Sequence, residues 1–374
     1  MTETRDLFHL PEGGPYLLAH SVGCLPRSAG PALEAGMLAP WRTAGGDAWA
    51  NWLDTIEGFR SAVATLLGVD AATVAPQTSV SAALFTLLSG LRPEPGKGVV
   101  LLSEQAFPTV GFVLAPLAGL GLTPRFILAH EDPSDPATWA RHCDGSVAAI
   151  IAMHVHSNSG LVSPVTEIAA LARKHGALSI LDVAQSAGIL PIAAREWGVD
   201  AMIGSCVKWL CGGPGAAYLH VRAERIPALE PLDVGWFAHE TPFAFDIHDF
   251  RYASDARRFQ GGTPSVAPFA LAAEGIRTVL AIGQDALLAN NRACIAAFEE
   301  EAGQSLDWSA RGGTLCLTCD DPTVATQALR AAGFAHDFRG AILRASFHGW
   351  NRPEEARAFA RTLCEAGVAL TPAR

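Results

Sequence analysis

The sequence predicts an α/β protein with a mostly parallel central sheet, helices on both faces, and a smaller C-terminal α/β domain. Between residues 74 and 182, short apolar runs of strand length alternate with segments of helical periodicity. This order is typical of parallel strands joined by crossover helices. The alternation starts again at residue 314, and a chain of 374 residues is long enough for two such units.

Composition narrows the class of protein. With 49% hydrophobic and 17% charged residues, the chain has the material for a large core and is not disordered. The formal net charge of −10 argues against a nucleic-acid partner, and no cluster of lysine and arginine indicates a membrane surface. Eight cysteines in a chain of this length predict no disulfide framework. The N-terminal residues lack the features of a signal peptide, so we expect a cytoplasmic protein.

The chain is expected to have three parts. Residues 1–50 show no periodic pattern apart from a short strand and turn at 16–23, and should pack on the small domain and the functional site. Residues 51–267 form the large domain and residues 268–374 the small one. The expected large-domain elements are helices 56–67 and 165–175, a buried helix with loops within the uncharged stretch 105–124, and strands 98–103, 147–153 and 177–181. The expected small-domain elements are a long helical pattern over 268–304, strands 314–319 and 341–347, and helices 322–332 and 353–367.

Lys208 stands apart from the other two lysines of the chain. Lys97 lies in a Pro/Gly turn and Lys174 in the polar last turn of a predicted helix. Lys208 instead follows the small and apolar run AMIGSCV and precedes the glycine-rich segment CGGPGAA. Desolvation in such a setting favours the neutral amine, which is the form that attacks a carbonyl.

Asp182 ends the apolar strand 177–181, and ligands of open α/β sheets bind at the carboxyl ends of strands. A carboxylate there needs a cation, and a protonated pyridine nitrogen supplies one. A lysine for a Schiff base and an aspartate for a pyridinium are the pair that pyridoxal 5'-phosphate requires of its protein. Each residue alone has a plain alternative, a capping aspartate and a lysine that reaches solvent from a loop. Together they predict a pyridoxal-phosphate site.

Residues at neighbouring strand ends extend this site. Thr78, Ser79 and Ser81 precede an apolar helix, where they suit a phosphate or simply cap the helix. Phe107 follows a predicted strand and either lies on an aromatic cofactor or fills the core. The loop 154–158, HVHSN, is interpreted as a polar loop near the cofactor ring, because no carboxylate accompanies its histidines at a metal-like spacing.

Arg344 lies in the apolar strand AILRASF, where an unpaired charge would be costly. It therefore requires an anion, either a structural carboxylate or that of a substrate, and its planar guanidinium suits both. Cys316 and Cys319 lie in the strand pattern TLCLTC without a second cysteine or histidine pair nearby. We interpret them as core residues and expect no metal site.

Taken together, the motifs resemble those of the class V aminotransferase superfamily, whose members are fold type I pyridoxal-phosphate enzymes, and most closely those of kynureninases. The resemblance extends from the YLLAHSVG turn to the C-terminal helix. Its most specific parts are DVAQ, SCVKWLCGGPG, GWFAHETPFAFD, RFQGGTPS and LRASFHGWN.

The resemblance implies a role for each matching residue. Lys208 would form the Schiff base and move the Cα proton, Asp182 would hold the pyridinium nitrogen, and Arg344 would bind the substrate α-carboxylate. The other implied cofactor residues are Thr78, Ser79 and Ser205 at the phosphate, Phe107 stacked on the ring, Gln185 at the ring hydroxyl or phosphate, and Ser157 or Asn158 near the ring hydroxyl. Further implied residues are Trp236 and Thr263, which would reach the phosphate across a homodimer interface, and His20 and Ser21 near the substrate.

Three positions depart from the kynureninase pattern: Val207 replaces a tyrosine, Gln185 a histidine and Val110 an aspartate. The resemblance implies first a kynureninase-like hydrolase that cleaves the Cβ–Cγ bond of a kynurenine-type amino acid. The alternatives are a class V aminotransferase, a Cβ-lyase of desulfurase or C–S lyase type, and an amino-acid epimerase. A non-catalytic pyridoxal-phosphate-binding regulator comes last, because no basic segment supplies a DNA-binding module. The implied partners are a small-molecule amino acid and a second copy of the chain that shares the active site.

Overall fold

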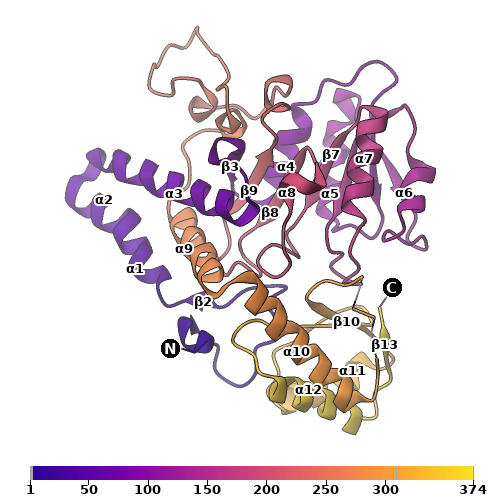
Figure 1. Cartoon of the computed structure of the whole chain (residues 1–374). Coiled ribbons are helices and arrows are strands. Elements are labelled where there is room, and N and C mark those ends of the chain that lie inside the picture. The colour runs from indigo at the N-terminus through magenta and orange to yellow at the C-terminus, as the bar shows by residue number, and fades with distance from the viewer. Residues whose placement is uncertain (1–2, 306, 309, 374) are drawn as a thin grey trace.

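The large domain is built on a seven-stranded sheet (Figure 1). The computed structural model describes residues 3–305, 307–308 and 310–373. In spatial order the strands are β3 (Val74–Gln77), β9 (Ala217–Val221), β8 (Ala201–Ser205), β7 (Leu178–Asp182), β6 (Val147–Met153), β4 (Val99–Ser103) and β5 (Thr123–Ile127). The strands from β8 to β5 run parallel to one another, and β9 is antiparallel to both of its neighbours. The predicted mostly parallel sheet is confirmed.

Alternate residues of the strands face two separate apolar layers. In β4, Leu101 packs into one buried cluster, while Val100 and Leu102 pack into the other. The helices of the first layer are α3 (Trp49–Leu67), α6 (Pro136–His142), α7 (Val165–His175), α8 (Ala194–Trp197) and α9 (Ala267–Ile282). Those of the second layer are α4 (Val80–Ser89) and α5 (Thr109–Leu117). Because both faces of the sheet are covered, its strands read as continuous apolar runs in the sequence.

Local signals set several helix bounds. α3 ends at Gly68, whose φ of 67° is left-handed, and α4 begins after Ser79, whose side chain accepts a hydrogen bond from the N–H of Ala82. α5 occupies the middle of the uncharged stretch that the sequence assigned to a buried helix. Within the part of the chain that the structure describes, no helix combines the length and apolar character needed to cross a bilayer.

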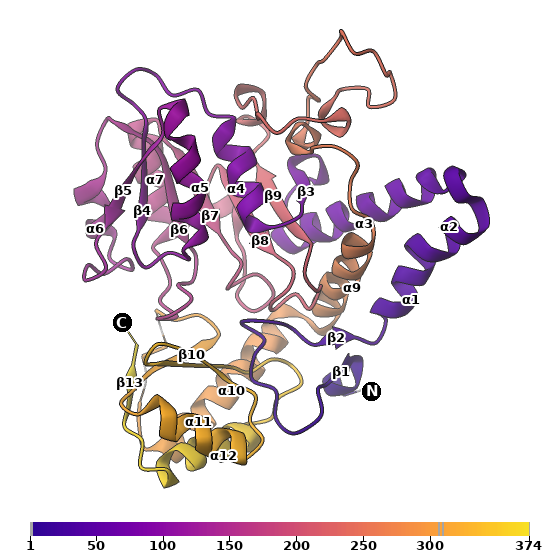
Figure 2. The same ribbon diagram turned by 180° about the vertical axis from the view of Figure 1, so that it is seen from behind.

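The N-terminal residues are more helical than the sequence pattern indicated. After the paired strands β1 (Phe8–His9) and β2 (Leu25–Pro26) come α1 (Ala29–Leu33), the π-helix Glu34–Leu38 and α2 (Ala39–Ala44). Together with α3 they form an arm that projects from the molecule (Figures 1 and 2). The expectation of an irregular segment was therefore wrong for residues 29–44. These short helices pack on α3 and α9, and tertiary packing rather than a long periodic pattern stabilises them.

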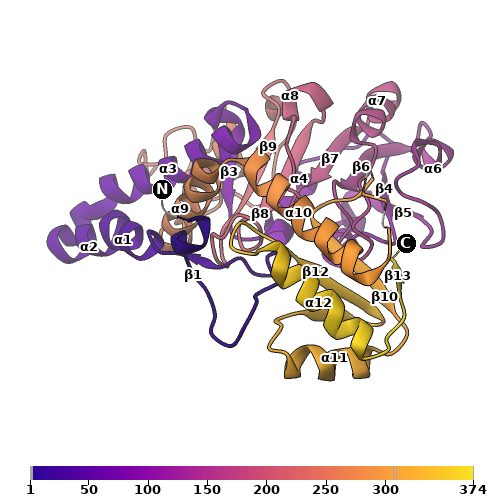
Figure 3. The ribbon, with the colours of Figure 1, turned by 60° about the horizontal axis from the view of Figure 1, so that its bottom comes forward.

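The smaller domain contains a four-stranded antiparallel sheet with helices beside it (Figure 3). In spatial order its strands are β11 (Asp337–Arg339), β12 (Ile342–Ser346), β10 (Thr314–Cys319) and β13 (Leu370–Pro372). Its helices are α10 (Gln284–Ala302), α11 (Pro322–Ala331) and α12 (Pro353–Glu365). The short strands β11 and β13 were not expected from the sequence.

The long helical pattern expected over residues 268–304 is two helices, not one. Gly283, with φ of 93°, separates α9 from α10. α9 packs against α3 of the large domain, whereas α10 packs against α12 of the small one. The chain thus crosses between the domains at Gly283, and the predicted boundary between residues 267 and 268 stays a prediction.

Candidate active site

A cavity of about 280 Å³ lies at the carboxyl ends of three adjacent parallel strands. Met153, Asp182 and Ser205, the last residues of β6, β7 and β8, all contribute to its wall. The predicted site residues that line the cavity are Thr78, Ser79, Phe107, Ser157, Asp182, Gln185, Ser205 and Lys208. The fold therefore brings together side chains that are up to 130 positions apart in the sequence.

Asp182 is buried at the end of β7. Its Oδ1 accepts a hydrogen bond from the N–H of Ala184 at 2.8 Å, which fixes the carboxyl group. Burial raises the pKa of Asp182, and the positive charge of Lys208 offsets part of this effect. A second cation in the cavity would stabilise the ionised form further.

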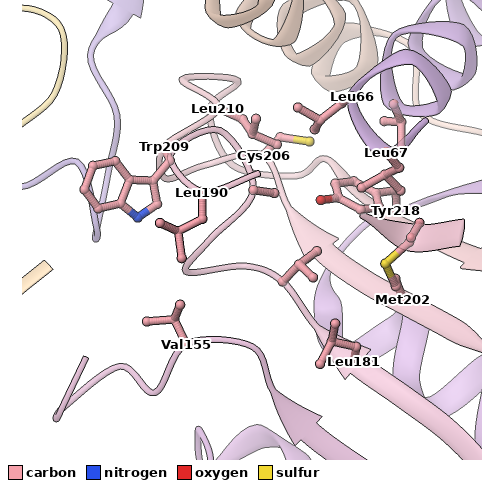
Figure 4. Close-up of a cluster of buried hydrophobic side chains, with 14 of the residues drawn as sticks. Leu66, Leu67, Val155, Leu181, Leu190, Met202, Cys206, Trp209, Leu210 and Tyr218 are labelled. Carbon is pink, nitrogen blue, oxygen red and sulfur yellow. The ribbon is translucent and has the colours of Figure 1, made fainter. Parts of the chain in front are cut away.

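Lys208 lies in the turn between β8 and the antiparallel β9. Cys206, Trp209 and Leu210 on either side of it are fully buried and anchor this turn in the core, as Figure 4 shows. The N–H of Gly212 donates to the carbonyl of Cys206 at 2.7 Å and closes the turn. While these neighbours point into the core, the side chain of Lys208 lines the cavity.

The surroundings of Lys208 lower the pKa of its amine. Burial lowers the pKa of Lys208, the carboxylate of Asp182 raises it, and the guanidinium groups of Arg339 and Arg344 lower it further. The Nζ atom lies 5.9 Å from the centroid of the Phe107 ring. A lowered pKa makes the amine easier to deprotonate, and the neutral form is the one that bonds a carbonyl carbon or accepts a proton.

The N-terminal segment passes between the small domain and the Lys208 turn. It pairs with β12 through Leu17 at one end, and at the other the N–H of Gly23 donates to the carbonyl of Val207 at 2.8 Å. A Cβ atom on Gly23 would lie 2.2 Å from the carbonyl oxygen of Lys208. A residue without a side chain is therefore required where this segment supports the turn.

Gln185 carries an oxygen that no described residue satisfies. Its Nε2 donates to the carbonyl of His20 at 3.2 Å, while its Oε1 is buried without a hydrogen-bond partner. An unsatisfied buried acceptor costs free energy. Because Gln185 lines the cavity, a ligand with a hydrogen-bond donor fits this position.

Arg344 is fully buried and has a structural carboxylate. Its Nε donates to Oδ1 of Asp337 at 3.0 Å, and its Nη2 bonds Oδ2 of the same residue. Its Nη1 donates to the carbonyl of Ser157 at 3.2 Å. Asp337 also accepts a hydrogen bond from Nε2 of His20 at 3.1 Å. Burial alone would raise the pKa of Asp337, but the hydrogen bonds from His20 and Arg344 outweigh it and hold that pKa below its usual range.

Several predicted residues lie outside the cavity wall: His20, Ser21, Trp236, Thr263 and Arg344. Trp236 packs against Trp49 and Phe243, with ring centroids 5.6 Å and 5.3 Å away. Thr263 lines a neighbouring hollow together with Thr78. Within one chain neither residue reaches the cavity, and their role across a dimer interface stays a prediction.

Sequence reasoning missed Arg339, whose guanidinium carbon lies 5.3 Å from the centroid of the Phe107 ring, and the apolar wall residues Met153 and Ala184. The Nη1 of Arg339 donates to Oγ of Ser157 at 3.2 Å and to Oδ1 of Asn158 at 3.3 Å. Arg339 could have been noticed in the triplet DFR, whose two charged residues stand directly before the apolar strand that carries Arg344. The apolar wall carries no signal in the sequence, because such residues also fill the core.

The fold and the lysine–aspartate pair define an α/β enzyme with its site at the carboxyl edge of a parallel sheet. The profile of the class V aminotransferases matches residues 46–307, so the chain belongs to this family. The resemblance inferred from the motifs is confirmed at that level.

Two curated relatives illustrate the similarity. An uncharacterized aminotransferase, YcbU, of Bacillus subtilis strain 168 is 34% identical over 238 residues, which are 64% of this chain and 62% of that protein. A kynureninase of Pseudomonas fluorescens is 30% identical over an alignment of 284 positions that covers 73% of this chain and 66% of that protein. The chain thus spans less than two thirds of the length of these relatives.

Solved structures agree with the fold. The C-DES mutant K223A, with glycine covalently linked to its PLP cofactor, has a TM-score of 0.85 at 23% identity and covers 96% of this chain and 99% of its own. An apo cysteine desulfurase of Thermococcus onnurineus NA1 has a TM-score of 0.82 at 19% identity, covering 97% and 96%. The predicted fold class is confirmed.

Class V aminotransferases are pyridoxal 5'-phosphate-dependent enzymes, and the residues of this cavity fit that cofactor. Asp182 offers a buried carboxylate to a ring cation, and Gln185 offers an unpaired oxygen to a donor. Ser79 and Ser205 present hydroxyl groups, and the N-terminus of α4 suits a phosphate. Lys208 completes the set with an amine whose pKa is lowered.

Proposed function

We propose that the protein binds pyridoxal 5'-phosphate through Lys208 and Asp182 and acts on a small-molecule amino acid. In this proposal it is a kynureninase-like hydrolase that cleaves the Cβ–Cγ bond of a kynurenine-type substrate. The observation that carries the cofactor site is the convergence of Asp182, Gln185 and Lys208 in one cavity. The relative named kynureninase, 30% identical over 73% of the chain, supports the hydrolase.

Each residue has a defined task in this proposal. When bound, the cofactor withdraws electrons from the Cα atom of an attached amino acid. Asp182 keeps a proton on the pyridine nitrogen, because its buried carboxylate is stabilised by a cation there. Lys208 would hold the cofactor through its aldehyde, and its amine, whose pKa burial lowers, would take the proton from Cα of a bound amino acid. Phe107, Ser79 and Ser205 line the same cavity; Phe107 would lie against the cofactor ring, and the two serines would hold the phosphate.

A class V aminotransferase is the second candidate, and one observation favours it. Asp182 and Lys208 are the ionisable side chains among the described residues that line the cavity, and Val207 is apolar. Transamination requires a base that moves a proton from Cα to a carbon of the cofactor, which Lys208 can do alone, whereas hydrolytic Cβ–Cγ cleavage also requires a group that activates water for addition at the Cγ carbonyl. The YcbU aminotransferase is 34% identical to this chain. A Cβ-lyase or an epimerase starts from the same proton removal, but no cysteine is among the described lining residues.

The test is a product assay on the purified protein loaded with pyridoxal phosphate. Adding L-kynurenine should release anthranilate and alanine, which chromatography detects. Lys208→Ala should lose both the visible absorbance of the lysine-bound cofactor and the products, while Lys174→Ala, an exposed lysine on α7, should retain them. Formation of a 2-oxo acid without anthranilate would replace the hydrolase by the aminotransferase. An unchanged visible spectrum in Lys208→Ala would refute the site assignment.

The proposal includes a cytoplasmic homodimer with a shared site. Trp236 and Thr263 lie outside the cavity of their own chain and would contribute to the phosphate site of the partner. Trp236 belongs to an aromatic segment in which Phe243 and Phe245 are exposed, as expected of a surface that a second copy covers. Sedimentation velocity of the loaded protein measures its mass, and a monomer at micromolar concentration would contradict the shared site.

A further inference from the structure

The buried imidazole ring of His20 lies between two polar side chains of the small domain. Its Nε2 is 3.1 Å from Oδ1 of Asp337, and its Nδ1 is 2.9 Å from Oγ of Ser346. The backbone carbonyl of His20 accepts a hydrogen bond from Nε2 of Gln185, which lines the cavity. His20 therefore connects the wall of the cavity with the carboxylate that pairs with Arg344.

The hydroxyl group of Ser346 can bond His20 in either charge state. It lies 2.9 Å from Nδ1 of His20 and 3.1 Å from the carbonyl oxygen of Leu17. When His20 is neutral with its hydrogen on Nε2, the hydroxyl donates to Nδ1 and Asp337 accepts from Nε2. When His20 is protonated, Nδ1 donates to the hydroxyl, whose own hydrogen turns to Leu17. A proton can therefore be added at Nδ1 without leaving either ring nitrogen unpaired.

The groups around His20 favour its neutral form. Burial lowers the pKa of His20 to about 4, the hydrogen bond to Asp337 raises it, and the positive charges of Arg344 and Lys208 lower it. The other charged or titratable groups that face Asp337 are Arg339, His336 and Cys316. One of the causes that lower the pKa of His20 is therefore a guanidinium charge, which an added anion can offset.

An anion at Arg344 would change this balance. Arg344 bonds Asp337 through Nε and Nη2, and its Nη1 donates to the carbonyl of Ser157, a residue of the cavity wall. Because Arg344 contacts that wall from outside, the carboxylate of an amino acid held at Lys208 would compete with Asp337 for it. The same carboxylate would offset the charge that lowers the pKa of His20. His20 already bonds Asp337 and can restore a cation to it by taking up a proton.

We propose that His20 takes up a proton from solvent when an amino-acid carboxylate binds at Arg344, so that Asp337 forms an ion pair with the imidazolium. His20 and Asp337 are then positioning residues, because they act on the substrate through Arg344. This inference rests on the proposed function and on the role that the family resemblance implies for Arg344. Since binding raises the pKa of His20, the affinity for a carboxylate ligand increases as the pH falls through that raised pKa.

The test counts protons with two unreactive probes and the full chain freed of cofactor. N-(5'-phosphopyridoxyl)-L-alanine carries the carboxylate, and N-(5'-phosphopyridoxyl)ethylamine lacks only that group. Calorimetric titration at pH 6 in MES and in imidazole, buffers with different enthalpies of ionisation, gives the number of protons taken up with each probe. The alanine probe should take up about 0.5 to 1 proton more than the ethylamine probe. Its affinity relative to the ethylamine probe should rise by up to about tenfold per unit as the pH falls from 7 to 5.

The variants assign the proton to a residue. His20→Gln should remove the extra proton while both probes still bind, because the amide can donate to Asp337 as the neutral imidazole does. Asp337→Asn should also remove it, because no carboxylate remains to stabilise an imidazolium. His336→Gln removes the other histidine that faces Asp337 and serves as the matched control, with the full difference retained. The count on the wild-type protein tests the inference even where a variant is unstable.

Two kinds of result would overturn different statements. Equal proton uptake with the two probes, or a difference that His20→Gln retains and His336→Gln removes, would overturn the inference about His20. Asp337 would then stay on Arg344 or pass to Arg339 without a proton. If neither probe binds, the proposed cofactor site fails and this inference falls with it. The ethylamine probe separates the two cases, because its binding requires the cofactor site but no carboxylate contact.

Discussion

Removing Asp337 should destabilise the protein more than removing Arg344, although the two residues form one ion pair. The side chain of Arg344 is 2% exposed, whereas that of Asp337 is 30% exposed. Asp337→Asn leaves a guanidinium charge in a dry site without its carboxylate, and breaking a buried pair in this way costs about 3–5 kcal/mol. Arg344→Gln leaves a carboxylate that reaches solvent and keeps its hydrogen bond from His20, so we expect a loss of about 1–3 kcal/mol.

Thermal unfolding of the wild-type protein, both single variants and the double variant at pH 7 measures this difference. With an unfolding entropy of about 2.1 cal/mol/K per residue, a loss of 3 kcal/mol lowers the Tm of a 374-residue chain by about 4 °C. The double variant should be more stable than Asp337→Asn, because it removes the unpaired charge. A double-mutant cycle on the exposed ion pair Asp249–Arg251, whose side chains are 45% and 57% exposed, serves as the control. Its interaction free energy should be below about 1 kcal/mol.

Equal losses in the two single variants, or strictly additive losses in the double variant, would refute this reasoning. Either result would mean that Asp337 does not balance the charge of Arg344. Arg344 would then be free to bind a substrate carboxylate.

Two further predictions concern the N-terminal segment and the buried histidines. A Cβ atom on Gly23 would lie 2.2 Å from the carbonyl of Lys208, so Gly23→Ala should weaken cofactor binding at least about tenfold in a visible titration. Gly111→Ala, where the added atom meets nothing on α5, should bind as the wild type does, and equal affinities of the two variants would contradict the idea. Burial lowers the pKa of five histidines from 6.5 to about 4, so between these values the unfolded chain binds more protons and stability falls as the pH falls. Each histidine contributes up to about 1.4 kcal/mol per pH unit to the slope of the free energy of unfolding against pH. Urea unfolding between pH 7 and 5 should show a smaller slope for His154→Gln than for the wild type. An unchanged slope would mean that burial does not lower the pKa of His154. The five residues are His20, His154, His156, His220 and His348.

Much of the fold could be predicted because the strands of a parallel sheet are apolar on both faces. β6 and α7 have the bounds that the apolar runs and the helical period indicated. The helices at residues 29–44 could not be predicted, because their stability comes from packing on α3 and α9. The break at Gly283 could not be predicted either, since a glycine within a helical pattern does not by itself fix a left-handed or extended backbone.

By itself the sequence determined the fold class, the family, and the positions of Lys208 and Asp182, because each depends on local patterns and motifs. Only the tertiary structure decided which charges meet. The apolar strand around Arg344 predicts that this residue needs an anion. That the anion is Asp337 follows only from the pairing of β11 with β12. Arg339 lies in the triplet DFR, but its place beside Phe107 results from docking the small domain on the large one. Charge balance depends on distances between groups remote in the chain, which a local pattern does not encode.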